Sequence, residues 1–426
     1  MVVRLIPSSL ATTAAAIFSA SLPASRLGAF GFAAVPLTRR SLAVLRPLSS
    51  SPWPEADGLT VSEPASSSPP IVFDDVCETA GVTLTRFLSE VALLNPGLSE
   101  LTALLSGVHT ATKAISNLVR RHPLPSDDVL GTVNKGDGGR GLDALSAELL
   151  RRALRFTGRL GILDGAEASE YGGDDEDDDA ADLLFDETSR YVALFEPLDG
   201  SAEGAPVGTT FGIFEHADTC SVSGPDDCLA ETIRSGANLV CSGYSLYSSS
   251  TFFVLTLGNG VYGFTLDENI GEYILSHPDV KIPTRSTTYS FDESRWDQWE
   301  DPVRETVRGW RNGTGESRRT FRSRYGGGLV EDVHRTLLYG GVFGRPIAHG
   351  GGAMGGETGG LRLLYEGEPM AFLVEQAGGM ATTGRERVVD VEPEVVHQRV
   401  PVIMGSADDV REIVDAYTTW DAARSP

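Results

Sequence analysis

A run of five apolar residues, Tyr191–Phe195, leads directly into the acidic segment Glu196–Ser201, which reads Glu-Pro-Leu-Asp-Gly-Ser. The run predicts a buried strand, and a proline between the two acids stiffens the turn so that both carboxylates can face one hard cation. The backbone N–H groups of Gly200 and Ser201 would suit a phosphate. A metal beside a phosphate indicates phosphoester hydrolysis, whereas the same residues taken alone are also compatible with a solvated acidic turn.

Length and composition limit the classes of protein that fit. With 426 residues, 41% of them hydrophobic and 22% charged, the chain can bury one large or two ordinary domain cores. It has no apolar run of about 18 residues, which predicts that no helix spans a membrane. The formal charge of −24 argues against nucleic acid or an anionic membrane as a partner, but allows a phosphorylated substrate because bound metals and arginines can invert the potential locally.

The amino end has a composition of its own. Residues 1–54 contain five arginines but no lysine and no acid, and they are rich in Ala, Ser and Leu, as organelle presequences are. The apolar stretch Leu10–Leu22 resembles the core of a signal peptide, so we expect a bipartite leader to a plastid (chloroplast) stroma, with a mitochondrial leader as the alternative. Residues 55–71 read as a disordered linker.

The body of the chain mixes helical and strand patterns. Apolar residues at helical spacing predict helices over 84–94, from 99 to 119, over 142–160, 332–338 and 369–377, and after Ser406. Strands are predicted at 191–195, 211–214, 251–257, 261–266, 361–365 and 402–404, with a hairpin turn at Gly258–Gly260. This mixture indicates an α/β or α+β fold built from packed layers. The acidic run Asp174–Asp179 is interpreted as a solvated insertion.

Four cysteines in a chain of this length do not form a disulfide framework. Cys220 and Cys228 flank a loop rich in Ser, Gly, Pro and Asp, and Cys241 follows shortly after. Free thiols are the simplest interpretation. A regulatory pair of Cys220 with Cys228 or Cys241 is the alternative, because cysteines in loops are accessible to reductants.

Several ordered blocks resemble class I fructose-1,6-bisphosphatase, and most closely its plastid form. The blocks are Gly243-Tyr244, Tyr247–Ser250, Gly263–Asp267, Asp332–Gly341, Leu361–Glu366, Val374–Gly379 and His397–Pro401. The resemblance covers roughly residues 72–420. It implies a layered α/β/α/β/α sandwich assembled as a homotetramer. An N-terminal regulatory-type half, 72–285, would carry most metal ligands, and a C-terminal half, 286–426, would bind substrate.

The resemblance also implies a metal site. Its ligands would be Glu170, Glu196, Asp199, the carbonyl near Leu198, and Glu366. All of them are oxygen donors, as Mg²⁺ requires, and two or more ions per subunit are implied, with Mn²⁺ or Zn²⁺ as possible substitutes. Asp137 and Asp143 match a mobile-loop carboxylate and a water-positioning carboxylate, so the implied catalytic residues are Asp137, Asp143 and Glu170.

The implied reaction is Mg²⁺-dependent hydrolysis of the 1-phosphate of fructose 1,6-bisphosphate to fructose 6-phosphate, a step of gluconeogenesis and of the Calvin cycle. Asp199, Gly200 and Ser201 would hold the 1-phosphate. Arg324 and Tyr325 would reach the 6-phosphate, with Arg324 crossing a subunit boundary. A thiol reductant such as thioredoxin is the partner that a regulatory cysteine pair would imply.

Departures from the family pattern fall close to the chemistry. They are Tyr171 for a second glutamate, Glu196 for aspartate, Ala202 for serine, Glu203 for asparagine, Asp292 for asparagine, Arg345 for tyrosine, and Gly360 for lysine. Reduced activity is therefore expected as one alternative, in the form of a weakened or inactive protein that binds sugar phosphates. Sedoheptulose-1,7-bisphosphatase activity is a further alternative to the implied function. At the nucleotide site implied by the family, Leu98 and Glu215 replace threonine and arginine, which predicts weak or no inhibition by AMP.

Overall fold

The computed structural model describes residues 71–73, 80–121, 138–155, 160–164, 190–200, 206–215, 238–348, 358–394 and 398–424. All of these residues belong to one unit, 47–426. The predicted presequence, 1–54, and all but residue 71 of the predicted linker lie outside the described residues.

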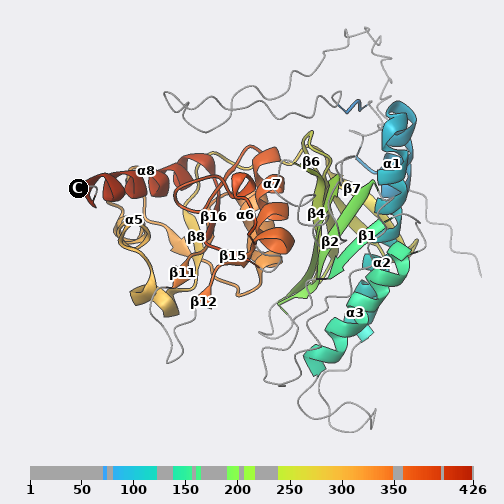
Figure 1. Ribbon diagram of the computed structural model, residues 1–426, viewed down its shortest axis with the longest axis horizontal. Coiled ribbons are helices and arrows are strands. Elements are labelled where there is room, and N and C mark those ends of the chain that lie inside the picture. Colours follow the sequence, from blue (N-terminus) through green and yellow to red (C-terminus); the bar gives the residue numbers. More distant parts are fainter. Residues whose placement is uncertain are drawn as a thin grey trace, which may run out of the picture. The chain divides into compact units, whose positions relative to one another are not determined.

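The first sheet has seven strands in sequential order (Figure 1). They are β1 (Leu160–Asp164), β2 (Tyr191–Asp199), β3 (Val207–Glu215), β4 (Leu239–Tyr247), β5 (Thr251–Thr256), β6 (Val261–Asp267) and β7 (Glu272–His277). Strands β1 and β2 are parallel, and every other neighbouring pair is antiparallel. The hairpin predicted at Gly258–Gly260 is confirmed, because it joins β5 to β6 and both glycines have a positive φ.

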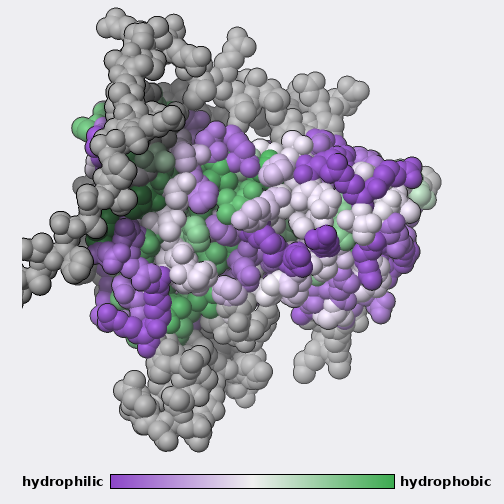
Figure 2. Space-filling view, turned by 180° about the vertical axis from the view of Figure 1, so that it is seen from behind, coloured by the Kyte–Doolittle hydropathy of each residue, from purple (hydrophilic) through white to green (hydrophobic). Residues whose placement is uncertain are grey.

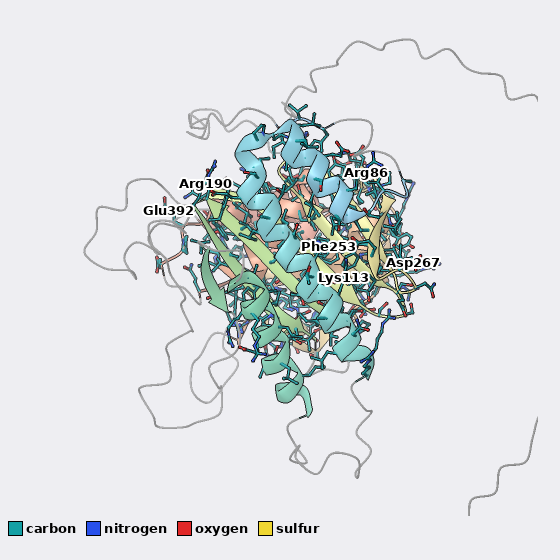
Figure 3. The ribbon with its side chains drawn as sticks, turned by 90° about the vertical axis from the view of Figure 1, so that its right-hand side faces the viewer. Arg86, Lys113, Arg190, Phe253, Asp267 and Glu392 are labelled. Atoms are coloured by element: carbon teal, nitrogen blue, oxygen red, sulfur yellow. The ribbon has the colours of Figure 1, made fainter. Side chains whose placement is uncertain are left out.

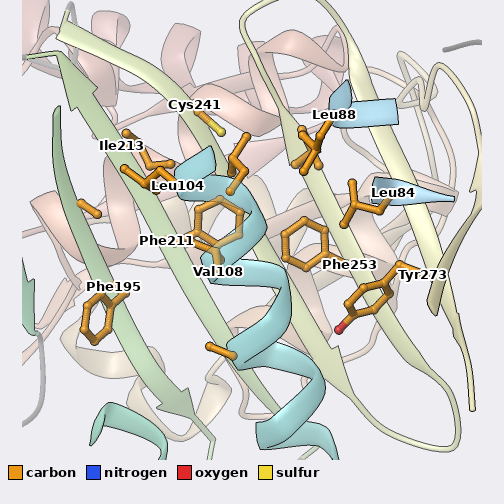
Figure 4. Packing of buried hydrophobic residues seen from close by; sticks show 14 of the residues in the cluster. Leu84, Leu88, Leu104, Val108, Phe195, Phe211, Ile213, Cys241, Phe253 and Tyr273 are labelled. Atoms are coloured by element: carbon orange, nitrogen blue, oxygen red, sulfur yellow. The ribbon is translucent and has the colours of Figure 1, made fainter. Parts of the chain in front are cut away.

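Three helices pack against one face of this sheet: α1 (Leu84–Leu94), α2 (Ser99–Arg121) and α3 (Gly138–Arg155). Figure 3 shows α1 and α2 lying across the strands. Their apolar stripes meet the inward side chains of β2–β7, and Figure 4 shows Leu84, Leu104 and Val108 of the helices facing aromatic residues of the strands. Helix α1 begins where Thr83 accepts the backbone N–H of Arg86 at 3.2 Å.

The second sheet has the order β14-β16-β10-β8-β9. Its strands are β8 (Thr288–Phe291), β9 (Arg322–Ser323), β10 (Val342–Arg345), β14 (Met380–Thr382) and β16 (Val402–Gly405). Two short pairs accompany it: β11 (Ile347–Ala348) with β12 (Thr358–Gly359), and β13 (Leu361–Arg362) with β15 (Arg399–Val400). Single-turn 3₁₀ helices occur at η1 (Pro96–Leu98) and η5 (Val388–Asp390), and η3 (Glu293–Gln298) is longer.

The remaining helices complete the layers. Helices α6 (Leu329–Tyr339) and α7 (Glu368–Gln376) contact strands of both sheets and therefore lie between them. Helices α5 (Asp301–Asn312) and α8 (Ala407–Arg424) pack against each other, and α8 also contacts β14 and β16. The sequence of layers is helices, sheet, helices, sheet, helices, which confirms the predicted α/β/α/β/α sandwich.

Three predicted elements need correction. The strand expected at 361–365 ends at Arg362, and the next five residues form the single-turn π-helix η4 (Leu363–Gly367). Four of its five residues are buried, and a short, largely apolar run cannot be assigned to strand or helix by periodicity. The helix expected over 142–160 ends at Arg155, and its last predicted residue begins β1. The strand expected at 191–195 continues to Asp199.

The described surface is mixed in character. Figure 2 shows hydrophilic residues over much of one face, with smaller hydrophobic areas between them. Among the helices that the structure describes, none combines the length and apolar character needed to cross a membrane.

His109 supplies a test of the contact between α2 and the sheet. Burial, and secondarily the charge of Lys113, lower the pKa of this histidine from 6.5 to about 4. The folded protein thus holds the imidazole neutral, whereas the unfolded chain protonates it below pH 6.5. The contribution of the neutral imidazole to the free energy of unfolding is therefore complete above pH 6.5 and is lost as the pH falls toward 4. The loss should be roughly 3 kcal/mol. In His109→Gln, the free energy of unfolding measured by urea titration should fall less steeply between pH 6.5 and 4 than in the wild type. The exposed Thr110→Ala is the control, and equal slopes in all three proteins would contradict the prediction.

Candidate active site

The acidic segment lies within the end of β2 and not in a turn after it. Glu196 pairs with Thr210 of β3 and Asp199 pairs with Gly208, so β2 holds one extra residue between the two pairs. Residues three apart in a regular strand point to opposite faces, and the extra residue of a β-bulge brings them to the same side. Pro197 suits the bulge because it has no N–H to donate. The expectation that both carboxylates face one position is thus met by a bulge.

Glu196 is buried next to other acids. Burial and then the charge of Glu366 raise the pKa of its carboxyl well above the usual value, and Asp143 and Asp199 add to this. Arg362 opposes the shift, donating from Nη1 to Glu196 Oε2 at 3.0 Å. Both side chains of this ion pair are largely buried. The structure therefore brings three further acids, from α3, β2 and η4, close enough to Glu196 to act on its charge, and pairs Glu196 with one guanidinium.

Asp199 connects this cluster to α6. Burial and then Glu366 raise the pKa of Asp199 to about 7. Its Oδ2 accepts the backbone N–H of Val330, in the first turn of α6, at 3.2 Å. The helix can approach because residue 208 is glycine, since a Cβ there would lie 2.6 Å from the side chain of Val330. The partial positive charge of a helix N-terminus favours a carboxylate at this position.

Glu366 is held by the π-helical turn. Its Oε2 accepts the backbone N–H of Arg362 at 2.7 Å, which closes the turn. Thr210 Oγ1 of β3 donates to the carbonyl of Tyr365 at 2.9 Å and fixes the turn against the first sheet. The neighbouring Thr209 Oγ1 donates to the carbonyl of Pro197 at 2.7 Å, beside Leu198. Two adjacent threonines of β3 therefore position both acidic segments.

The donor chemistry of the cluster fits Mg²⁺. The acids that β2 and η4 contribute, Glu196, Asp199 and Glu366, are oxygen donors, and the repulsion that raises the pKa of Glu196 and Asp199 is what a divalent cation would relieve. In the described part of the chain, no three acid, histidine or cysteine side chains form a ready metal cage. Mg²⁺ usually keeps several waters and takes one or two carboxylates together with substrate phosphates, so the partial set suits it.

A second group of predicted residues lies at the ends of three neighbouring strands. Strand β8 is parallel to both β9 and β10, so the carboxyl ends of the three lie at one edge of the second sheet. Asp292 follows β8, Arg324 and Tyr325 follow β9, and Arg345 ends β10. The guanidinium of Arg345 lies over the ring of Tyr325, 5.8 Å from its centroid. Its positive charge also opposes the upward shift in the pKa of Asp199. Arg345 therefore lies close to both Tyr325 and the acidic cluster.

Asp292 and Arg324 differ in how they are engaged. Asp292 caps η3, accepting the backbone N–H of Ser294 at 3.1 Å, and forms an ion pair with Arg295 at 3.4 Å. Arg324 is exposed, and within the described chain its side chain has no acidic partner. The same holds for Arg318, Arg319 and Arg322, so the segment before α6 presents unpaired positive charge. Such charge suits an anionic group.

The glycine at position 360 is required by the backbone. Gly360 has φ +70°, and a Cβ there would lie 2.6 Å from the carbonyl oxygen of Val400. The lysine of the family pattern therefore cannot be accommodated in this conformation.

We expect Gly360→Lys to lower stability without raising activity. A left-handed φ and a contact of 2.6 Å both oppose the side chain, and the combined cost should be about 1–3 kcal/mol. Thermal unfolding and phosphatase assays would measure the two effects. Higher activity at unchanged stability would show that the lysine fits. Gly81→Lys is the control for φ alone, because Gly81 has φ +93° and nothing within 4 Å of its Cβ position.

The other predicted residues divide into two groups. Gly200 directly follows β2 and has φ +85°, as a phosphate-binding turn allows. Cys241 lies in β4 with its thiol fully buried, and burial raises its pKa above the ordinary value. The predicted residues that lie outside the described residues are Asp137, Glu170, Ser201, Cys220 and Cys228, and the departures Tyr171, Ala202 and Glu203 lie there too.

Comparison with known sequences decides the family. A sequence model described as the N-terminal domain of fructose-1-6-bisphosphatase matches residues 82–278, and one described as its C-terminal domain matches residues 282–418. The chain belongs to the fructose-1,6-bisphosphatase family. The predicted resemblance is thereby confirmed.

Relatives and solved structures agree with the family. A chloroplastic fructose-1,6-bisphosphatase of Spinacia oleracea is 38% identical over 347 residues, covering 78% of this chain and 80% of the relative. A cytosolic form from the same plant is also 38% identical, over 354 residues, covering 82% of this chain and 98% of the relative. The holo-form crystal structure of the Leishmania major fructose-1,6-bisphosphatase matches with a TM-score of 0.66 at 31% identity, covering 80% of this chain and all of the other.

Two contributors to the fructose-1,6-bisphosphatase site were missed from the sequence. Arg362 was read as part of a strand, and the first turn of α6 was not included in the predicted helix. A signal for Arg362 was present, because a lone arginine between leucines in a buried segment needs a carboxylate partner. The amide of Val330 left no such signal, since any residue carries a backbone N–H.

Proposed function

We propose that this member of the fructose-1,6-bisphosphatase family hydrolyses the 1-phosphate of fructose 1,6-bisphosphate, releasing fructose 6-phosphate and phosphate. The observation that carries the proposal is the convergence of the acids Glu196, Asp199 and Glu366. Arg345 connects them to the edge of the second sheet, because it acts on the charge of Asp199 and lies over the ring of Tyr325. One end of the site is suited to cations and the other to an anion. A sugar with two phosphates matches both.

Each residue has a proposed role. Glu196, Asp199, Glu366 and the carbonyl near Leu198 would hold magnesium together with Glu170, in two or more sites that Mn²⁺ or Zn²⁺ could also fill. When bound, the metal supplies positive charge that stabilises the phosphoryl group in transfer. Asp137, Asp143 and Glu170 are the candidates for positioning the attacking water and removing its proton.

The sugar is held from the opposite side. Gly200 and Ser201 would offer backbone N–H groups to the 1-phosphate, and Arg324, Tyr325 and Arg345 would form the 6-phosphate end. Asp292 lies at the same sheet edge, and its bond to Ser294 keeps it turned toward η3. This arrangement reduces the opposition that an acid would otherwise offer to a phosphate.

Phosphate release tests the function. Purified protein with fructose 1,6-bisphosphate and Mg²⁺ should release inorganic phosphate, and EDTA should stop the release. Fructose 6-phosphate is the control substrate and should give none, while sedoheptulose 1,7-bisphosphate measures the alternative specificity. No release at any Mg²⁺, Mn²⁺ or Zn²⁺ concentration would sink the proposal.

A weakened, sugar-phosphate-binding member of the family is the second candidate, favoured by Gly360, where the backbone excludes lysine. Tyr171→Glu separates the two. Little change in the rate favours a fully active enzyme, and a large gain favours a weakened one.

Location and assembly are proposed on narrower grounds. The chloroplastic relatives and the composition of residues 1–54 support a plastid location, with the mitochondrion as the alternative. A homotetramer is proposed from the membership of the chain in this family. The proposed halves, 72–285 and 286–426, agree with the end of the first sheet at His277 and the start of the second at Thr288.

The proposed redox control uses the pair Cys220 and Cys228. Cys241 is not the expected partner of Cys220, because its thiol is buried in the core, stays protonated there and therefore reacts slowly. A dithiol reductant such as thioredoxin should then raise the rate of the wild type but not of Cys228→Ser. Identical oxidised and reduced rates would remove the proposal.

We expect AMP to inhibit weakly or not at all. Glu215 forms an ion pair with Arg190 at 3.0 Å, and Arg190 also donates to the carbonyl of Gly97 at 3.1 Å, so the cation near Leu98 is already engaged (Figure 3 labels Arg190). An anionic nucleotide would meet the Glu215 carboxylate. Activity measured against AMP tests this, with Glu215→Gln as the variant that should be more sensitive. Micromolar inhibition of the wild type would contradict the prediction.

A further inference from the structure

The segment Arg324–Gly328 joins β9 to α6 and carries residues of the proposed 6-phosphate end. It contains three consecutive glycines, and Gly327 has φ +93°, so its own sequence does little to fix its conformation. One anchor comes from Arg345, whose Nη2 donates to the carbonyl of Gly327. A second anchor holds the backbone of Gly326 on the other side of this segment.

That anchor is Asp332, a fully buried acid in α6. Both of its carboxylate oxygens lie 3.2 Å from the backbone nitrogen of Gly326 and accept its N–H. Arg335, one turn further along the helix, donates from Nη2 to Oδ1 at 2.6 Å. The carboxylate is therefore charge-compensated by the helix and directed at the glycine segment.

We propose that Asp332 is a positioning residue that fixes the distance between the two phosphate-binding ends of the site. The same helix donates the N–H of Val330 to Asp199, at the acidic end. Asp332 ties the segment bearing Tyr325 to that helix, so both ends are held by one rigid element. This inference rests on the proposed function, since the two ends matter together only for a bisphosphate.

The effect should be confined to the 6-phosphate end. Without the Asp332 carboxylate, the glycine segment loses the acceptor of the Gly326 N–H, while α6 keeps its hydrogen bond to Asp199. A displacement of about 1 Å is enough to change rates or affinities by up to a hundredfold. A general loss of structure would instead weaken both ends equally.

The test uses Asp332→Asn, which keeps the shape but leaves a single oxygen to accept from both the Gly326 N–H and the Arg335 guanidinium, so the glycine segment loses its firm anchor. The KM for fructose 1,6-bisphosphate should rise by about tenfold, with kcat changed by less than about threefold. The inhibition constant of fructose 6-phosphate should rise in parallel, and that of inorganic phosphate should stay unchanged. Glu331→Gln, a neighbouring acid that does not accept the Gly326 N–H, is the matched control and should behave as wild type.

A second variant covers a failure of Asp332→Asn to fold. In Gly327→Ala, the added side chain opposes the left-handed φ of +93°, so the substitution displaces the segment while Asp332 remains. The same selective weakening of fructose 6-phosphate is expected. Equal losses for both inhibitors, or unchanged constants in a folded variant, would overturn the inference. Wild-type phosphate release reports separately on the proposed function.

Discussion

Asp199→Asn should lower kcat by about 10²–10³ while leaving the fold intact. The variant keeps an oxygen that can accept the N–H of Val330, so the contact between β2 and α6 survives. It loses the negative charge that faces Glu366 and the proposed metal position. The rate should fall because the cation would bind less tightly and the phosphoryl group would be held less well. Steady-state phosphate release at saturating Mg²⁺ measures the effect.

The control for this variant is Asp279→Asn. Asp279 is exposed, pairs with Lys281 and has φ +53°, a conformation that asparagine tolerates. Its kcat should equal that of the wild type. If Asp199→Asn retained more than about a third of wild-type kcat, Asp199 would not belong to the catalytic centre.

Arg362→Met should destabilise the metal-free protein by about 3–5 kcal/mol, because Glu196 then remains buried beside Glu366 without its guanidinium partner. Mg²⁺ should restore part of that stability, since a bound cation replaces the lost charge. Thermal unfolding in EDTA and in Mg²⁺ measures both effects without relying on catalysis. The shift caused by Mg²⁺ should be larger in the variant than in the wild type.

The control for the arginine is Arg308→Met, which breaks an exposed ion pair with Glu305 on α5. Exposed pairs contribute at most about 1 kcal/mol, so this variant should unfold near the wild-type temperature with the same response to Mg²⁺. An Arg362→Met protein as stable as the control, or indifferent to Mg²⁺, would show that Glu196 does not face a cation.

Much of the fold could be predicted from periodicity. Long amphipathic helices such as 84–94 and the strand of Tyr191–Phe195 have strong local signals, and the structure has both. The π-helical turn at Leu363–Gly367 could not be predicted, because four of its five residues are buried and so short a run shows no period. Strand β9 is two residues long and forms only because β8 pairs with it, which is a tertiary effect.

The site was predictable in its residue types more than in its geometry. Glu196 and Asp199 were recognised as a pair, but the β-bulge that turns them to one side depends on the register with β3. Likewise, Tyr325 and Arg345 are 20 positions apart in sequence, and only the parallel arrangement of three strands places them at one edge. Backbone donors such as Val330 N–H are outside the reach of sequence patterns.

The most direct test of the proposed metal and sugar-phosphate site is anomalous diffraction from crystals of the protein soaked in Mn²⁺ with fructose 6-phosphate and phosphate. We expect manganese peaks within about 2.6 Å of carboxylate oxygens of Glu196, Asp199 or Glu366, with the sugar phosphate against Tyr325 and Arg345. Clear density for the sugar phosphate, with no manganese near these three acids, would contradict this expectation.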